Sequence, residues 1–234
     1  LISYDEGQKT FIQHASHELK TPIMIITSYA QSVKDGVMPK ESIDDTMDVI
    51  LQETGKMEKR IGDMLYFSKL DALKDENVSQ ERILIRFGSL ASDIEERFRF
   101  QRDDVTITIQ GEDVEFYGLR EQFESLLDNL VQNAMRYAKD TIVLEAKQTD
   151  TETVITVYNN GQPIPDDVKK TMFEPFQKGK EGKFGLGLAI VKRIAMLHHG
   201  IVEVENKQDG VAFHVVIPTQ QSEERGKQNE KKPH

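Results

Sequence analysis

A long, regular repeat of apolar residues is the feature that most constrains this chain. From residue 12 the apolar positions recur at alternating steps of three and four: Ile12, Ala15, Leu19, Pro22 or Ile23, Ile26, Ala30, Val33 and Val37. This spacing predicts one helix with a narrow apolar seam. After Gly36 and Pro39 a second seam follows at Ile43, Met47, Ile50, Thr54, Met57, Ile61 and Met64, with Leu51, Leu65 and Leu70 beside it. The pattern therefore predicts a helical hairpin.

The apolar stripes of the hairpin predict that it pairs with a second copy of the chain. Each helix has about 30 residues, or about 45 Å at 1.5 Å per residue. Two such helices cannot cover both of their own apolar stripes, so we expect a homodimer in which two hairpins form a four-helix bundle.

The pattern changes after residue 73, where a polar segment (KDENVSQE) reads as a linker. We expect the end of an upstream signalling linker at 1–8, the hairpin domain at 9–73, a linker at 74–82, a mixed domain at 83–219 and a disordered polar tail at 220–234. Strands are predicted at 83–87, 105–109, 114–117, 141–147, 153–159, 201–206 and 211–217, and helices at 90–101, 119–138 and 186–198. The predicted fold class is α+β: the hairpin, then an α/β sandwich with helices on one face of a mixed sheet.

Charge and composition exclude several classes of function. The 234 residues carry a net charge of -10, which argues against nucleic-acid binding because a phosphate backbone needs a basic face. The chain has no cysteine, so it has neither disulfides nor thiolate metal sites. No window approaches the roughly 18 to 20 apolar residues of a membrane span. We expect a cytoplasmic fragment without membrane contact, cut from a longer protein whose anchor lies upstream.

His17 is the first candidate for chemistry. It lies two residues from both Ala15 and Leu19, which places it on the side of the helix opposite the seam, where Thr21 follows one turn later. An exposed imidazole has a free nitrogen that can attack a γ-phosphate if a carboxylate orients its other nitrogen, and Glu18 is the natural base. The local pattern alone favours a surface histidine without a function, and a metal site with His14 and Glu18 lacks the usual i, i+4 histidine spacing.

Pro22 lies within this helix. Thr21 and Pro22 also look like a helix start, but the seam stays in phase across them. We therefore expect a continuous helix that is kinked at Pro22, where the missing N–H frees the carbonyl of Glu18.

Residues 16–22, SHELKTP, resemble the phosphoacceptor motif of the sensor histidine kinases of two-component systems. The hairpin likewise resembles their dimerisation and phosphotransfer domain. The resemblance implies that His17 is the phosphoacceptor and Glu18 the base. It also implies that Glu18 and Thr21 orient a water molecule that dephosphorylates a partner response regulator.

Two asparagines fall on one stripe of the predicted helix at 119–138. Asn129, Asn133 and Arg136 are spaced by four and three residues, and Mg²⁺ accepts amide oxygens as ligands, although a solvated helix face has the same pattern. Residues 129–137, NLVQNAMRY, resemble the N box of these kinases. The resemblance implies that Asn133 and Asn129 hold Mg²⁺, that Arg136 meets phosphate and that Tyr137 packs near the adenine.

The segment at 159–165, NNGQPIP, is similar in position to the G1 box, with Asn159 where Asp is usual and Pro163 where a second glycine is usual. Asn159 can still accept a hydrogen bond from the adenine amino group, without charge assistance. Gly161 belongs to the same box.

Two further boxes follow. Residues 173–176, FEPF, resemble the F box, and Gly185, Leu186, Gly187 and Leu188 resemble the G2 box, which opens a helix whose free N–H groups can meet phosphate. The basic, glycine-rich segment between them looks like a lid over the triphosphate, with Lys178 as the γ-phosphate contact.

Together the motifs predict ATP- and Mg²⁺-dependent autophosphorylation on His17, then transfer to an aspartate on the receiver domain of a response regulator. Two alternatives stay open: a plain ATPase with the nucleotide fold of gyrase, and a degenerate kinase acting as a phosphatase or scaffold.

Overall fold

The computed structural model describes residues 2–73, 82–177 and 185–219. Its backbone forms two compact units. One consists of Leu1–Lys69 with Pro175–Leu186, and the other of Leu70–Glu174 with Gly187–His234. The predicted Lys178 lies outside the described residues, as do the lid, the tail and most of the linker.

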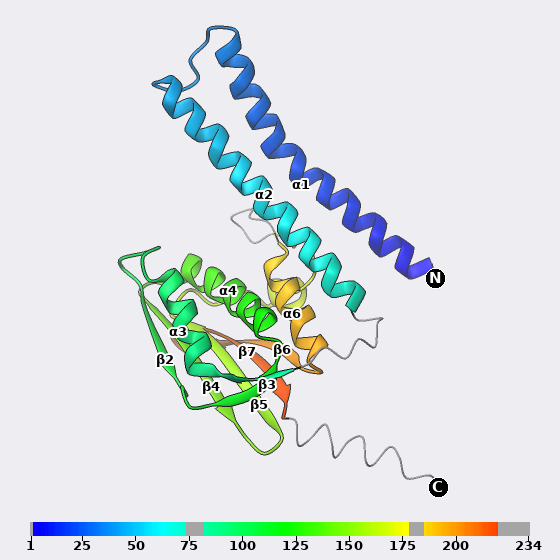
Figure 1. Cartoon of the computed structure of the whole chain (residues 1–234), viewed down its shortest axis with the longest axis vertical. Helices are drawn as coiled ribbons and strands as arrows, with labels where there is room; N and C mark the ends of the chain where they lie inside the picture. Colours follow the sequence, from blue (N-terminus) through cyan, green and yellow to red (C-terminus); the bar gives the residue numbers. More distant parts are fainter. Residues whose placement is uncertain (1, 74–81, 178–184, 220–234) are drawn as a thin grey trace. The chain divides into compact units, whose positions relative to one another are not determined.

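A helical hairpin forms most of the first unit (Figure 1). Helix α1 (Ile2–Lys34) runs through Pro22 without a break, and α2 (Ile43–Leu73) follows after a short turn. Gly36 has a φ of 72°, which suits a residue without a side chain. Ser42 caps α2, because its hydroxyl accepts the N–H of Asp45 at 3.0 Å. The predicted hairpin and the continuous first helix are both confirmed.

The second unit is built on a five-stranded sheet. Its order is β2 (Thr106–Gln110), β4 (Thr141–Gln148), β5 (Glu152–Asn159), β7 (Gly210–Pro218) and β6 (Ile201–Lys207). The β2–β4 pair is parallel and the other three pairs are antiparallel, so the sheet is mixed as predicted.

Three helices cover one face of this sheet (Figure 1): α3 (Phe87–Phe98), α4 (Arg120–Tyr137) and α6 (Gly187–Leu197). Alternate strand residues point at the helices and are almost fully buried, among them Ile142, Leu144, Ile155, Val157, Phe213 and Val215. The apolar stripe of α4, which includes Leu126, Leu127 and Leu130, packs into the same core. This core fixes α4, and with it the polar stripe on the other side of that helix.

Three details differ from the prediction or extend it. The strands β1 (Ile83–Arg86) and β3 (Glu115–Gly118) pair antiparallel in a ribbon of their own, apart from the main sheet. Helix α3 begins directly at Phe87, which was expected to be the end of a strand. The short helix α5 (Asp166–Thr171) was not predicted.

The α+β class, with a helical hairpin followed by an α/β sheet domain, is confirmed. Among the helices in the described ranges, none is long and apolar enough to cross a bilayer.

Candidate active site

His17 lies on an exposed part of α1, as its spacing from the seam predicts. Thr21, one turn further, is also exposed, whereas the side chain of Glu18 is buried, at 7 % exposure. The imidazole and the hydroxyl therefore share the solvent face, while the carboxylate is largely withdrawn from water. An accessible imidazole can act as a nucleophile, and the carboxylate that could serve as its base belongs to the next residue of the helix.

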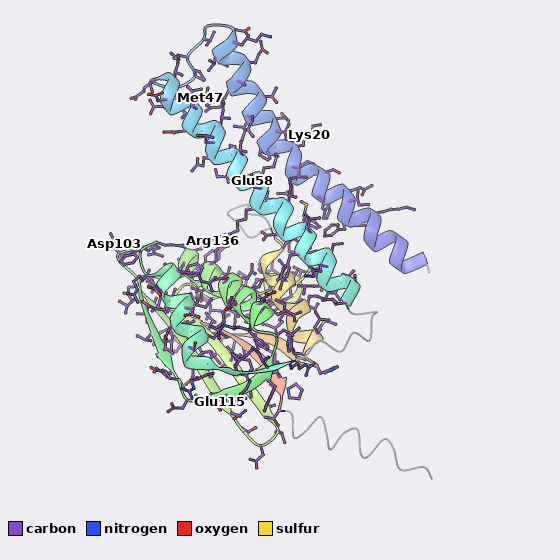
Figure 2. All side chains as sticks on the ribbon, in the orientation of Figure 1. Lys20, Met47, Glu58, Asp103, Glu115 and Arg136 are labelled. Carbon is purple, nitrogen blue, oxygen red and sulfur yellow. The ribbon has the colours of Figure 1, made fainter. Side chains whose placement is uncertain are left out.

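The predicted polar stripe of α4 is present in the second unit. Asn129, Asn133 and Arg136 are all half-buried, at successive turns of the helix. Arg136 lies near the C-terminal end of α4 (Figure 2), with its guanidinium carbon 5.8 Å from the centre of the Tyr137 ring. Tyr137 itself is exposed. These side chains give two amide groups, one cation and one aromatic ring along one face.

Asn129 has a fixed orientation. Its Nδ2 donates to the carbonyl of Ser125 at 2.8 Å, and its Oδ1 lies close to the start of α6. A Cβ added at Gly187 would lie only 2.7 Å from that oxygen. Gly187 thus leaves room for an amide oxygen of α4 directly beside the first turn of α6.

Asn159 and Gly161 lie at the end of β5. Asn159 is 3 % exposed and is paired across the sheet with Ile142 and Val211. A Cβ at Gly161 would meet the carbonyl oxygen of Tyr137 at 2.3 Å and the Asn159 side chain at 2.6 Å. The loop after β5 therefore passes against the last residue of α4, and only a glycine fits there.

Asn160 was not singled out from the sequence, yet it organises this end of the domain. Its Oδ1 accepts the backbone N–H groups of Lys139, Asp140 and Thr141 at 3.1 to 3.2 Å, and its Nδ2 donates to the Asp140 carboxylate at 2.8 Å. Hydrogen bonds from the Thr141 hydroxyl and then from the Asn160 amide hold the pKa of Asp140 below its usual value. Asn160 ties the α4–β4 turn to the end of β5.

Asn206 on β6 has a similar role one loop further. Its side-chain amide both accepts the N–H of Ile164 and donates to the carbonyl of Ile164, each at 2.9 Å. These two hydrogen bonds have the pattern that the backbone of a neighbouring strand would supply. It fixes the loop that holds Pro163 and precedes α5.

The residues of the predicted G2 box have different surroundings. Leu186 is fully buried and Leu188 half-buried. In the first unit, a Cβ at Gly185 would lie 2.1 Å from the carbonyl oxygen of Gln177, so this close backbone contact requires glycine. The N–H of Phe176 donates to the carbonyl of Gly185 at 2.9 Å.

The groups in the second unit fit a magnesium-bound nucleotide. Amide oxygens are ligands that Mg²⁺ accepts, and Asn129 Oδ1 has a defined direction. The α6 helix begins at Gly187, so its first backbone N–H groups have no partners within the helix and can meet phosphate. Arg136 supplies a cation on the same face as the asparagines.

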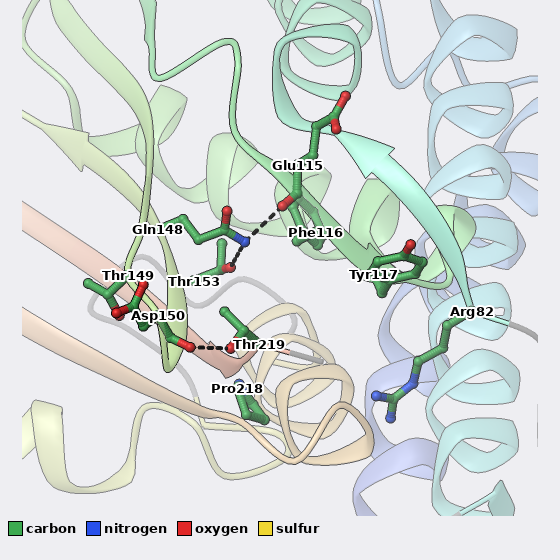
Figure 3. A pocket seen from close by; sticks show the side chains of 10 residues that line it. All are labelled: Arg82, Glu115, Phe116, Tyr117, Gln148, Thr149, Asp150, Thr153, Pro218 and Thr219. Carbon is green, nitrogen blue, oxygen red and sulfur yellow. Dashed lines mark hydrogen bonds between the residues drawn. The ribbon is translucent and has the colours of Figure 1, made fainter. Parts of the chain in front are cut away.

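A cavity of about 450 Å³ lies elsewhere in the second unit (Figure 3). Gln148 lines it and donates to the carbonyl of Glu115 and to the Thr153 hydroxyl, while the Thr219 hydroxyl donates to the carbonyl of Asp150. None of the predicted nucleotide-binding residues lines this cavity. It is therefore distinct from the candidate active site.

An exposed histidine on a helical hairpin, followed by a sandwich with a polar α4 stripe and a glycine-opened α6, defines a class of ATP-dependent phosphotransfer proteins. Comparison with known families agrees. Residues 8–73 match the His Kinase A (phospho-acceptor) domain, and residues 118–221 match the histidine kinase-, DNA gyrase B- and HSP90-like ATPase family. The chain belongs to the sensor histidine kinases of two-component systems.

Curated relatives support this assignment. The chain is 41 % identical over 219 residues to the sensor histidine kinase CssS of Bacillus subtilis, and 28 % identical over 229 residues to the sensor protein SrrB of Staphylococcus aureus. These matches cover 93 % and 92 % of this chain, but only 48 % and 38 % of the two relatives. The chain thus spans about half the length, or less, of these proteins.

Solved structures show the same fold. The histidine kinase AdeS of Acinetobacter baumannii aligns with a TM-score of 0.73 at 21 % identity, covering 87 % of this chain and 98 % of that one. The kinase ThkA, in a complex with the response regulator protein TrrA, aligns with a TM-score of 0.71 at 23 % identity, covering 94 % of this chain and 67 % of that one.

Proposed function

We propose that the chain binds ATP with Mg²⁺ in its α/β unit and transfers the γ-phosphoryl group to His17. The observation that carries this proposal is that one chain holds an exposed histidine, followed in sequence by a buried carboxylate, and also the oriented Asn129 amide near the glycine start of α6. The match of each half to the corresponding kinase family supports it.

The reaction needs one bond formed and one broken. A ring nitrogen of His17 attacks the γ-phosphorus while the bond from that phosphorus to the bridging oxygen of ADP breaks, so ADP leaves with the electron pair. Glu18 accepts or orients the N–H on the other ring nitrogen, which offsets the positive charge that develops on the imidazole. Positioning and charge neutralisation supply most of the rate in phosphoryl transfer.

In the nucleotide site, Asn133 and Asn129 would hold the metal and Arg136 would meet phosphate. Mg²⁺ supplies neutralisation of the charge on the phosphate oxygens when it is bound. Asn159 would accept a hydrogen bond from the adenine amino group, Tyr137 would pack near the ring, and Lys178 would contact the γ-phosphate. Gly161, Gly185, Leu186, Gly187 and Leu188 would shape the backbone around the nucleotide.

Incubation with γ-labelled ATP and Mg²⁺ tests the proposal. We expect acid-labile label on the wild type and no label on His17→Ala or Asn133→Ala. The His17→Ala variant should still bind a fluorescent ATP analogue, whereas Asn133→Ala should bind it weakly. Label that persists in His17→Ala contradicts the assignment, hydrolysis without protein labelling indicates a plain ATPase, and no nucleotide binding by the wild type indicates a scaffold.

The partner in this scheme is a response regulator, whose receiver aspartate takes the phosphoryl group from His17. The exposed Thr21, on the same face as His17, supports a second activity in which it positions a water molecule to dephosphorylate the receiver. Thr21→Ala should keep labelling of His17 but slow the loss of label from a receiver that the wild type has phosphorylated. Equal loss of label in both proteins would exclude this role.

A further inference from the structure

The carbonyl of Glu18 has an unusual partner. In an α-helix this carbonyl accepts the N–H of the residue four positions later, but that residue is Pro22, which has no N–H. Arg60 on α2 supplies the missing donor, because its Nη1 lies 2.7 Å from the Glu18 carbonyl oxygen. A side chain 42 residues away thus takes the place of a backbone donor within α1.

This bond acts on the turn that carries the chemistry. The Glu18 carbonyl lies directly after His17 and one turn before Pro22, and Pro22 is itself buried. A proline usually lets a helix bend because the freed carbonyl turns to water or to another donor. A guanidinium donor forms a stronger bond than a neutral one, and Arg60 belongs to the neighbouring helix. The bond therefore ties the backbone between His17 and Thr21 to α2.

We propose that Arg60 is a positioning residue for phosphoryl transfer, which holds the Glu18 peptide and thereby keeps the His17 ring and the Glu18 carboxylate in their relative orientation. Arg60 acts through the backbone of α1, whose Glu18 carbonyl it binds. The inference rests on the proposed kinase function of His17.

Substitution of Arg60 gives the first part of the test. Arg60→Met should lower the kcat of autophosphorylation about tenfold, which is the loss expected from one charged hydrogen bond in the reacting geometry. The KM for ATP should stay within about twofold, because the nucleotide site is unchanged. Arg60→Lys keeps a donor and should recover part of the rate. Lys56→Met is a matched control, since Lys56 pairs with Glu53 on its own helix at 2.6 Å.

A double-mutant cycle with Pro22 gives the second part. Pro22→Ala restores the N–H that the Glu18 carbonyl normally accepts, so Arg60 is no longer needed there. In this background Arg60→Met should change kcat by less than about twofold. An equal loss in both backgrounds, or a loss that appears in KM, overturns the proposal. If Arg60→Met does not fold, Pro22→Ala must restore its folding, and a double variant that stays unfolded also overturns it.

A readout of stability separates this inference from the proposed function. Arg60→Met should lower the midpoint of thermal unfolding more in the Pro22 protein than in Pro22→Ala, whether or not the chain is active. Absence of label on His17 in the wild type contradicts the kinase function alone. Equal shifts of the midpoint in the two backgrounds contradict the role of Arg60 alone.

Discussion

The contact between Gly187 and Asn129 restricts the type of residue that fits at position 187. A methyl group at Gly187 would lie 2.7 Å from Asn129 Oδ1, a distance that real Cβ atoms essentially never show. The amide would have to turn away, and its direction is set by the 2.8 Å bond to Ser125. The need for glycine here comes from the position of a side chain on another helix.

Gly187→Ala should therefore weaken binding of ATP with Mg²⁺ by about tenfold or more, which corresponds to about 1.4 kcal/mol or more. Titration with a fluorescent ATP analogue measures this. Gly62→Ala is the control, because nothing lies within 4 Å of a Cβ at Gly62. That change should leave binding intact and stabilise α2 by about 0.5 to 1 kcal/mol. Unchanged binding in Gly187→Ala would show that this contact has no part in the site.

Asp63 on α2 is a second residue with a measurable consequence. Burial raises the pKa of its carboxyl, and Lys59 partly opposes this. A raised pKa in the folded state means that ionisation costs more in the fold than in the unfolded chain. The contribution of Asp63 to stability is thus most favourable below its unfolded pKa and worsens as the pH rises through the folded pKa.

Asp63→Asn should raise the free energy of unfolding at pH 7 by up to about 1 kcal/mol, a modest gain because the side chain is only half-buried. The gain should shrink as the pH falls below about 4, where both states are protonated. Urea unfolding followed by helix ellipticity at the two pH values measures it. A gain that is equal at both pH values would point to packing and not to ionisation.

At the scale of elements, hydrophobic spacing predicted most helices and strands to within three residues at each end. The start of α3 was missed because its first N–H groups bond to distant backbone: Phe87 N–H donates to Val114 and Gly88 N–H to Glu112. A local capping residue is therefore unnecessary, and the sequence carries no start signal. Helix α5 has six residues, which is too short for an apolar period to show.

The spacing of the motifs predicted the polar stripe on α4 and the glycine-rich start of α6. It could not reveal the residues whose hydrogen bonds hold these segments in place. Asn160 and Asn206 bond to residues about 20 and 42 positions away, and the Arg60 bond spans 42. Such contacts depend on how elements pack, which no local pattern encodes.

Loss of Asn160 should loosen the connection between α4 and β4. Asn160→Ala removes the acceptor of three backbone N–H groups and should lower the free energy of unfolding by about 1 to 3 kcal/mol. Asn160→Asp keeps an acceptor but places a second carboxylate against Asp140. Its penalty should therefore grow as the pH rises above about 4. Chemical denaturation across pH distinguishes the two variants, and a pH-independent loss in Asn160→Asp would contradict this reading.

At the scale of the whole molecule, the single hairpin leaves much apolar surface uncovered. Large side chains remain exposed on both helices, with Leu51 and Leu65 at 68 % each, and Ile12, Ile23, Met24, Ile43, Met47 and Ile61 between 36 % and 60 %. Monomeric proteins seldom expose so many large apolar side chains on one pair of helices. The pattern supports the proposed four-helix bundle of two copies.

Leu65→Glu should shift the chain from dimer to monomer by placing a charge in this surface. Sedimentation equilibrium measures the change, and Glu58→Gln, a substitution at an exposed position of the same helix, is the control. A wild-type chain that sediments as a monomer would remove the basis of the four-helix bundle.

The parallel pairing of β2 with β4 dictates where this protein can tolerate inserted or deleted residues. Parallel neighbours require the chain to return across the sheet between them, and only three residues separate the end of α4 from Thr141, where β4 begins. One extra residue between Asn129 and Asn133 would rotate the rest of α4 by about 100° and carry Asn133 and Arg136 off the line set by Asn129. The turn at 35–42 faces no such restriction, so natural length variation should collect there and be absent from α4.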